Sequence, residues 1–263
     1  MRAATQHAWQ SWPTSAEPWF RARAFGVAAE DLGVDFHGQA RPLLLTQLLG
    51  TCLRRSDDGV FSEEELWSWT LSRRLQGLLA IVVATGVSRL DAVAHCPQAS
   101  CGEAMELPLP LSSFSRSDDI AAFDWTADDG VVVNVAMPTG ADQLHWLNQP
   151  KLSAVSMAQH LVRGDASTLS ASAVDSLSAT FEEKDPFTAL QLNAQCPACG
   201  AAVAVDFDLE AELLRRLDRF QAHRLREIHL LASTYHWSET EIMNLPPWRR
   251  AHYLRQAAAE RVS

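Results

Sequence analysis

Apolar positions recur at helical spacing in the stretch that follows the first 60 residues. The stripe consists of Leu71, Leu75, Leu78, Leu79 and Val82. Ser62 and Glu65 precede it as a capping box, in which each residue satisfies a backbone N–H group that the start of a helix leaves free. Gly86 suits the C-terminal cap. These signals predict a helix over about residues 63–85.

A two-residue alternation of apolar and other positions follows each of two cysteine-containing turns. Met105, Leu107 and Leu109 alternate after the first turn, and Val203 and Val205 after the second. The first pattern predicts a β-hairpin whose turn holds Cys96 and Cys101. The second predicts a strand that runs on into a helix.

The last third of the chain has the longest helical stripe. It comprises Leu213, Leu217, Phe220, Ile228, Leu231 and Tyr235. Asp208 is a suitable cap for this helix of about 25 residues. Ser238 and Glu241 form a second capping box, and Pro246 and Pro247 begin a last helix. We therefore expect a helical hairpin over residues 209–263.

Two weaker patterns lie between the cysteine turns. Thr139, with Asp142 three residues on, predicts the start of another helix. Val174, Leu177 and Phe181 keep helical spacing within a Ser/Ala-rich segment, which favours a helix over a disordered linker.

The charge of the chain is strongly negative and unevenly distributed. The formal net charge is −10. Nine arginines against seven acids from Leu209 onward give this end +2, which leaves −12 for the first 208 residues. Such a surface repels nucleic acid and anionic membranes. Leu78–Val87, the longest apolar run, is about half the roughly 20 residues that a membrane span needs. With no signal-peptide core at its start, the chain is expected to be cytoplasmic.

The five cysteines divide into two close pairs and one isolated residue. Cys52 lies in a predicted helix and is expected to be a small buried apolar residue. The pairs occur in "CPQASCG" and "CPACG", each a tight turn whose backbone N–H groups should point at the sulfurs. Two such turns facing each other would place the sulfurs of Cys96, Cys101, Cys196 and Cys199 in a tetrahedron, which predicts a structural Zn²⁺ site.

Two alternatives to zinc remain open. A redox C-x-x-C motif stands at the N-terminus of a helix, whereas the residues after Cys199 alternate like a strand. The cysteines could also be unligated and buried.

No other constellation indicates catalysis. The spacings of His223, His229 and His236 do not form a metal-binding helix face, and the chain has no phosphate-binding, dinucleotide-binding, nucleophile-elbow or H-E-x-x-H motif. The aromatic residues of the C-terminal segment, Trp237, Trp248 and Tyr253, are expected to cap its core rather than to anchor a partner.

The order of parts resembles a family of baseplate proteins, of the hub-assembly type, from contractile-tailed phages and related contractile injection systems. The resemblance is carried by "HCPQASCGE", "PTGADQLHWL", "EKDPFTALQLNAQCPACG" and "REIHLLASTYHWSETEIMNLPPWRRAHYL", and it covers about Phe61 to Arg255. The tail segment is the most specific part. The first cysteine turn is longer than the family pattern.

The resemblance implies a non-enzymatic structural or chaperone-like protein whose partners are other baseplate or hub proteins. It would be cytoplasmic and could enter the assembled tail particle. No small-molecule substrate, membrane or nucleic acid is expected as a partner. A zinc-ribbon protein that binds nucleic acid is the main alternative, and a thiol oxidoreductase is the other.

The expected fold is α+β and mostly helical, with a zinc-ribbon-like pair of cysteine-knuckle hairpins and a C-terminal helical hairpin. The expected divisions are an N-terminal segment of uncertain structure (1–60), a helix with a discontinuous zinc-knuckle module and inserted helices (61–208), and the helical hairpin (209–263).

Overall fold

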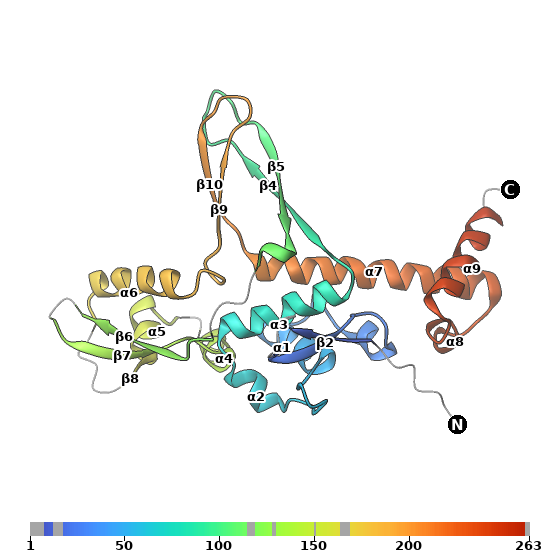
Figure 1. Ribbon diagram of the computed structural model, residues 1–263, viewed down its shortest axis with the longest axis horizontal. Helices are drawn as coiled ribbons and strands as arrows, with labels where there is room; N and C mark the ends of the chain where they lie inside the picture. The colour runs from blue at the N-terminus through green and yellow to red at the C-terminus, as the bar shows by residue number, and fades with distance from the viewer. Residues whose placement is uncertain are drawn as a thin grey trace.

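The computed structural model describes residues 8–12, 18–114, 119–127, 130–149, 151–163 and 169–260. It has four parts, which we call the body, the arm, the side lobe and the C-terminal end (Figure 1). The predicted α+β class, with its paired cysteine hairpins and helical C-terminus, is confirmed. Among the described helices, none combines the length and apolar character needed to cross a bilayer.

The body contains the N-terminal elements. They are β1 (Trp9–Trp12), β2 (Phe20–Arg23), a 3-10 helix η1 (Ala29–Gly33), α1 (Arg41–Cys52), β3 (Leu53–Arg54), α2 (Glu63–Ser68) and α3 (Leu71–Ala84). The three strands form an antiparallel sheet in the order β1-β2-β3. The long helix α7 (Leu209–Tyr235) packs against α3.

The main hydrophobic core draws on residues from all three expected divisions of the chain. Its buried side chains include Phe20, Phe25, Leu48 and Leu49 from the first 60 residues, Leu75, Leu78 and Leu79 from α3, and Leu209, Leu213 and Leu217 from α7. Cys52 lies in this core, as predicted, and burial raises the pKa of its thiol to about 12. The start of α7 is therefore part of the body.

The N-terminal residues are tied to α7 by a polar network. Asp31 is fully buried and accepts bonds from Arg23 and from the backbone N–H groups of residues 26–28. The amide nitrogen of Gln221, on α7, donates to the carbonyl oxygens of Asp31, Leu32 and Val34 at 2.9–3.2 Å. These bonds fix the segment that contains η1 against the middle of α7.

The arm consists of two antiparallel hairpins that project from the body (Figure 1). One is formed by β4 (Arg89–His95) and β5 (Ala104–Pro110), the other by β9 (Gln191–Gln195) and β10 (Ala202–Asp206). A short 3-10 helix, η2 (Leu111–Ser113), follows β5. Both turns lie at the end of the arm farthest from the body.

The side lobe has its own core. It contains β6 (Ala122–Thr126), β7 (Val132–Ala136), β8 (Val162–Arg163), α4 (Gly140–Leu147), α5 (Ala154–Leu161) and α6 (Ala171–Lys184). Phe123, Trp125, Val135 and Leu177 are among its buried residues. The helices predicted from the Thr139–Asp142 cap and from the Ser/Ala-rich segment are both present.

The C-terminal end continues from α7 through α8 (Glu239–Met243) to α9 (Pro247–Glu260), which packs back on α7. The expected caps are present, because the Asp208 side chain accepts from Ala211 and Ser238 and Glu241 form a capping box.

The structure corrects one predicted element, the single helix over residues 63–85. It is divided into α2 and α3, with Trp69 and Thr70 in an extended conformation between them. Here the chain bonds to the segment before α4: Leu71 N–H donates to the Pro138 carbonyl, and Gly140 N–H to the Trp69 carbonyl. Backbone pairing with a distant segment replaces the helix at this point.

A buried guanidinium organises this junction. Arg74 of α3 is fully buried and donates to the carbonyl oxygens of Leu66 and Pro42 and to the Thr46 hydroxyl, at 2.8–2.9 Å. Its charge lies 4.9 Å from the centre of the Trp67 ring. Gly140 is packed so closely that an added Cβ would lie 2.5 Å from an Arg74 Nη atom. The arginine thus joins α1, α2, α3 and α4.

We predict that Gly140→Ala destabilises the protein by about 1–3 kcal/mol, because a methyl group would displace the Arg74 guanidinium from its acceptors. Denaturant unfolding followed by tryptophan fluorescence measures the change. Gly33→Ala is the matched control, since an added Cβ there meets nothing within 4 Å. It should leave the free energy of unfolding within about 1 kcal/mol of the native value. Equal effects of the two substitutions would contradict the role given to Gly140.

Candidate metal centre

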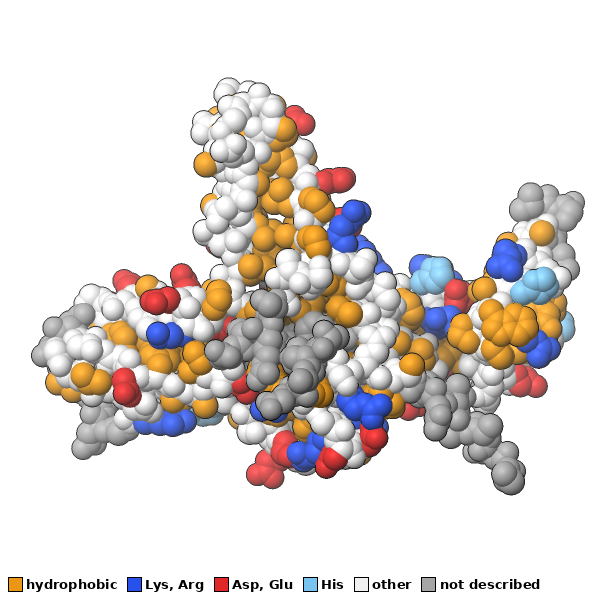
Figure 2. All heavy atoms as spheres, in the orientation of Figure 1, with side chains coloured by type: hydrophobic (Ala, Val, Ile, Leu, Met, Phe, Trp, Pro, Cys, Tyr) orange, Lys and Arg blue, Asp and Glu red, His pale blue; other side chains and the backbone are white. Residues whose placement is uncertain are grey.

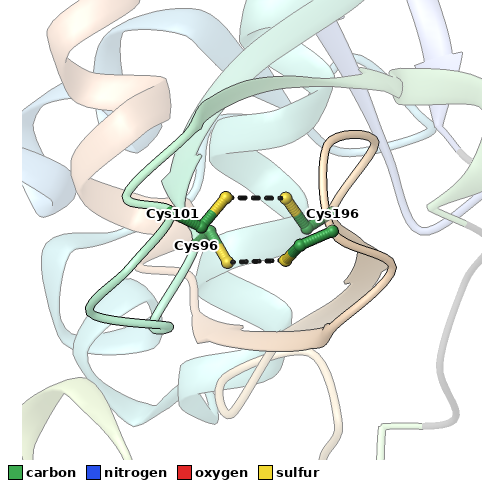
Figure 3. Close-up of side chains that lie close together, drawn as sticks. Cys96, Cys101 and Cys196 are labelled. Carbon is green, nitrogen blue, oxygen red and sulfur yellow. Dashed lines mark hydrogen bonds between the residues drawn. The ribbon is translucent and has the colours of Figure 1, made fainter.

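The four cysteines of the two turns meet at the end of the arm. All four Sγ atoms lie within 4.8 Å of one another. The closest approaches cross between the hairpins, at 3.6 Å from Cys96 to Cys199 and 3.7 Å from Cys101 to Cys196 (Figure 3). The cysteines are free thiols rather than disulfides. The structure thus brings together all four of the residues that the sequence indicated as ligands, close enough to hold a metal ion.

Each turn is closed by backbone bonds that place its cysteines at the strand ends. Cys96 N–H donates to the Glu103 carbonyl, and Cys196 N–H donates to the Ala201 carbonyl. Gly102 and Gly200 follow the second cysteine of each pair and have positive φ values of 62° and 74°. Glycine adopts this left-handed conformation without steric cost, which explains the shared Cys-Gly step.

Backbone N–H groups also point at the sulfurs, as the sequence predicted. The N–H groups of Cys199 and Ala198 donate to the Cys196 sulfur and lower the pKa of that thiol to about 7. The Gln98 N–H favours the thiolate of Cys96, yet loss of solvent and the neighbouring cysteines outweigh it and raise that pKa to about 12. Four thiolates this close together repel one another, and a bound dication would compensate for their charge.

The sulfurs differ in their access to solvent. Cys196 is 2% exposed and Cys96 is also buried, whereas Cys101 is half-buried and Cys199 is exposed. Beneath them, Ala94, Met105 and Val203 form a small cluster that is separate from the main core. The arm therefore has little apolar burial of its own.

The coordination that this site offers is closed. Four sulfur ligands occupy every position around a tetrahedral ion, so that none is left for a substrate or a reactive water. The geometry also differs from a redox C-x-x-C site, since Cys199 leads into strand β10 rather than a helix and Cys196 is buried.

The charges along the arm do not match a nucleic-acid surface. The charged side chains from residue 89 to 110 and from 191 to 206 are Arg89, Asp91, Glu103, Glu106 and Asp206. The one arginine pairs with Asp91 at 2.9 Å. Figure 2 shows the upper arm with few charged side chains on the visible face. The described part of the arm thus has no basic stripe.

The other candidate residues lie elsewhere. His223 and His229 are exposed on α7, and His236 is its left-handed C-terminal cap. Within the described ranges, the four cysteines are the one group of three or more Cys, His, Asp or Glu residues that could hold an ion. Trp237 and Tyr253 meet edge to face and pack against the core of the C-terminal end. The prediction that Trp248 also belongs to that core is wrong, because this side chain is 73% exposed.

Comparisons of the chain with family profiles, curated proteins and solved structures found no match.

The sequence indicates the four sulfurs but not their setting at the end of a projecting arm. The signal was present in β4, where the inward positions are Leu90, Ala92 and Ala94. Side chains this small toward the turn cannot build a substantial core, and the cysteines themselves make up part of the small cluster there.

We predict that Cys101→Ser weakens the arm and leaves the body intact. With one sulfur ligand lost, amide hydrogen exchange should accelerate in β4, β5, β9 and β10, while protection of α1 and α3 stays unchanged. Mass-spectrometric hydrogen exchange measures both regions in one experiment.

Cys52→Ala is the matched control, because Cys52 lies in the main core. It should destabilise the body by about 1 kcal/mol, through a small cavity, and leave exchange in the arm as it was. Loss of protection in α1 and α3 on Cys101→Ser would show that arm and body are one cooperative unit and contradict the prediction.

Proposed function

We propose that the ion at the four-cysteine site is Zn²⁺ with a structural role. With Zn–S bonds of about 2.3 Å, tetrahedral sulfurs lie about 3.8 Å apart. The closest sulfur pairs, at 3.6 and 3.7 Å, match this spacing. An all-thiolate donor set favours zinc over calcium or magnesium, which prefer oxygen ligands.

Zinc would act as a cross-link between distant parts of the chain. Cys101 and Cys196 are 95 residues apart, and closing a loop of that length costs a few kcal/mol. Structural zinc returns on the order of 10–16 kcal/mol at neutral pH. Isolated two-stranded hairpins are marginal in water, so the ion would keep the two hairpins together as one arm.

We infer further that the protein is a non-enzymatic structural or assembly component of a contractile-tail or injection-system baseplate. The observation that carries this inference is the order of parts from Phe61 to Arg255, which resembles the hub-assembly type of baseplate protein. The segments that carry the resemblance connect structural elements to one another. The "PTG-D" segment caps α4 and bonds to the break between α2 and α3, and the second cysteine hairpin leads into α7. A closed coordination sphere on a projecting arm also favours a scaffold over an enzyme.

The alternatives have less support. A zinc-ribbon protein that binds nucleic acid needs a basic surface on its hairpins, and the described charges there are mainly acidic. A thiol oxidoreductase needs a reactive cysteine within reach of its substrate, and the cysteine with the lowered pKa is 2% exposed.

Elemental analysis tests the identity of the ion. Protein purified without added metal or chelator should contain about one zinc per chain, and Cys101→Ser or Cys199→Ser should lose it. Cys52→Ala should retain it. A native chain that is folded and free of metal would contradict the structural-zinc proposal.

Assembly of contractile particles tests the biological role. In the phage or cell that encodes the chain, deletion of its gene should abolish assembled tails in electron micrographs, and the native gene in trans should restore them. A tagged chain should co-purify with baseplate proteins, and mass spectrometry of purified particles distinguishes a resident component from an assembly chaperone. Normal tails in the deletion strain would overturn the baseplate role while leaving the zinc site untouched.

A further inference from the structure

Trp248 is held outward at the C-terminal end on a rigid support. It follows Pro247, the first residue of α9, and is 73% exposed. At the same end of the molecule, the rings of Tyr235 and Trp237 stack, and both meet the ring of Tyr253, on α9, edge to face. Because α9 is fixed in this way, covering Trp248 on binding would cost little conformational entropy.

The next residue adds a positive charge. The Arg249 side chain donates to the Tyr253 hydroxyl at 3.2 Å and lies over that ring. It is exposed and has no carboxylate partner within the described ranges. We call Trp248 and Arg249 the knob. Tryptophan and arginine are the residue types that most often dominate binding energy at protein interfaces.

A groove with the complementary character lies on the body, around Trp67 of α2. It consists of two hollows of about 630 and 470 Å³ that share Glu63 and Trp67. On its other side the first is lined by α4, with Leu144 and the polar His145, and the second by α1, with Leu43 and the polar Gln47. We call these two hollows the Trp67 groove.

The floor of the groove is rigid and its edge is acidic. The Trp67 indole N–H donates to Glu63, and the buried Arg74 guanidinium lies 4.9 Å from the centre of its ring. Glu63 and Glu64 are exposed in the first turn of α2, and neither forms an ion pair with a described residue. Apolar side chains edged by carboxylates that form no ion pair in the described part of the chain would suit an exposed tryptophan beside an arginine.

We propose that the knob of one copy of this chain docks in the Trp67 groove of a second copy. Docking within one chain is excluded by the fold, since α2 lies on the lower side of the body and α9 packs at the far end of α7 (Figure 1). The distribution of charge favours this contact. The segment from Leu209, which contains the knob, carries +2, and the preceding residues, which contain the groove, carry −12.

The contact joins two different surfaces. Reciprocal docking of two copies would close a two-fold dimer, whereas one-way docking leaves a free knob and a free groove and would give rings or open chains. The charged contribution at the exposed edge should weaken as salt increases. This inference is independent of the baseplate role and concerns the purified chain alone.

Sedimentation velocity over a concentration series tests the proposal. The native chain should associate into dimers or larger species as its concentration rises, and Trp248→Ala should weaken association by roughly 30-fold, the threshold effect of a dominant interface residue. Glu64→Arg should weaken it from the groove side. Val93→Ala is the matched control, because Val93 is 61% exposed on the arm, away from both surfaces, and it should leave association unchanged.

Mixing the two defective chains gives the decisive measurement. The Trp248→Ala chain keeps its groove and the Glu64→Arg chain keeps its knob, so an equimolar mixture should form one-to-one dimers and nothing larger. Circular dichroism should show both variants folded, since both positions are exposed. A native chain that stays monomeric at every concentration would overturn the proposal and assign the knob to a different protein. Association unaffected by Trp248→Ala would overturn it as well.

Discussion

A buried positive charge constrains the centre of this molecule, because its hydrogen-bond acceptors in the described ranges are neutral oxygens. Moving a guanidinium out of water costs several kcal/mol, and the cost is recovered only where acceptors are fixed around it. Burial lowers the pKa of Arg74 to about 10, which leaves the group charged at neutral pH. Two carbonyl oxygens, one hydroxyl and the face of Trp67 therefore have to stay in place, and they belong to α1 and α2. The packing of α4 through Gly140 depends on the same geometry.

The arm and the body are stabilised by different means. The body buries leucines and aromatic residues contributed by α1, α3 and α7. The arm has a cluster built mainly from alanine, valine, methionine and cysteine, which is too small to hold two hairpins together by apolar burial alone. A four-sulfur site at the turns would compensate for this small core, because a single bound ion would hold the strands together where they are farthest from the body.

Local signals in the sequence predicted most of the secondary structure and the four sulfurs. Capping boxes at Ser62 and Ser238 and the stripe along α7 depend on neighbouring residues, so they can be read without the fold. The break at Trp69 and Thr70 could not be predicted in this way, because it is set by backbone pairing with residues 138–140. The exposure of Trp248 was missed for a similar reason: Tyr235, Trp237 and Tyr253 already fill the space at the C-terminal end. Whether an apolar residue is buried therefore depends on which other side chains occupy the same space in the fold, and the local sequence does not show this.

The four sulfurs differ in their exposure to solvent, and this difference would set the order in which they exchange. Cys96 and Cys196 are shielded, whereas Cys199 faces solvent. A chelator or an oxidant would meet Cys199 before the other sulfurs, and release of an ion would begin with this one bond. The lifetime of such a cross-link would then be set by the rate at which one residue exchanges, even though its strength would come from four.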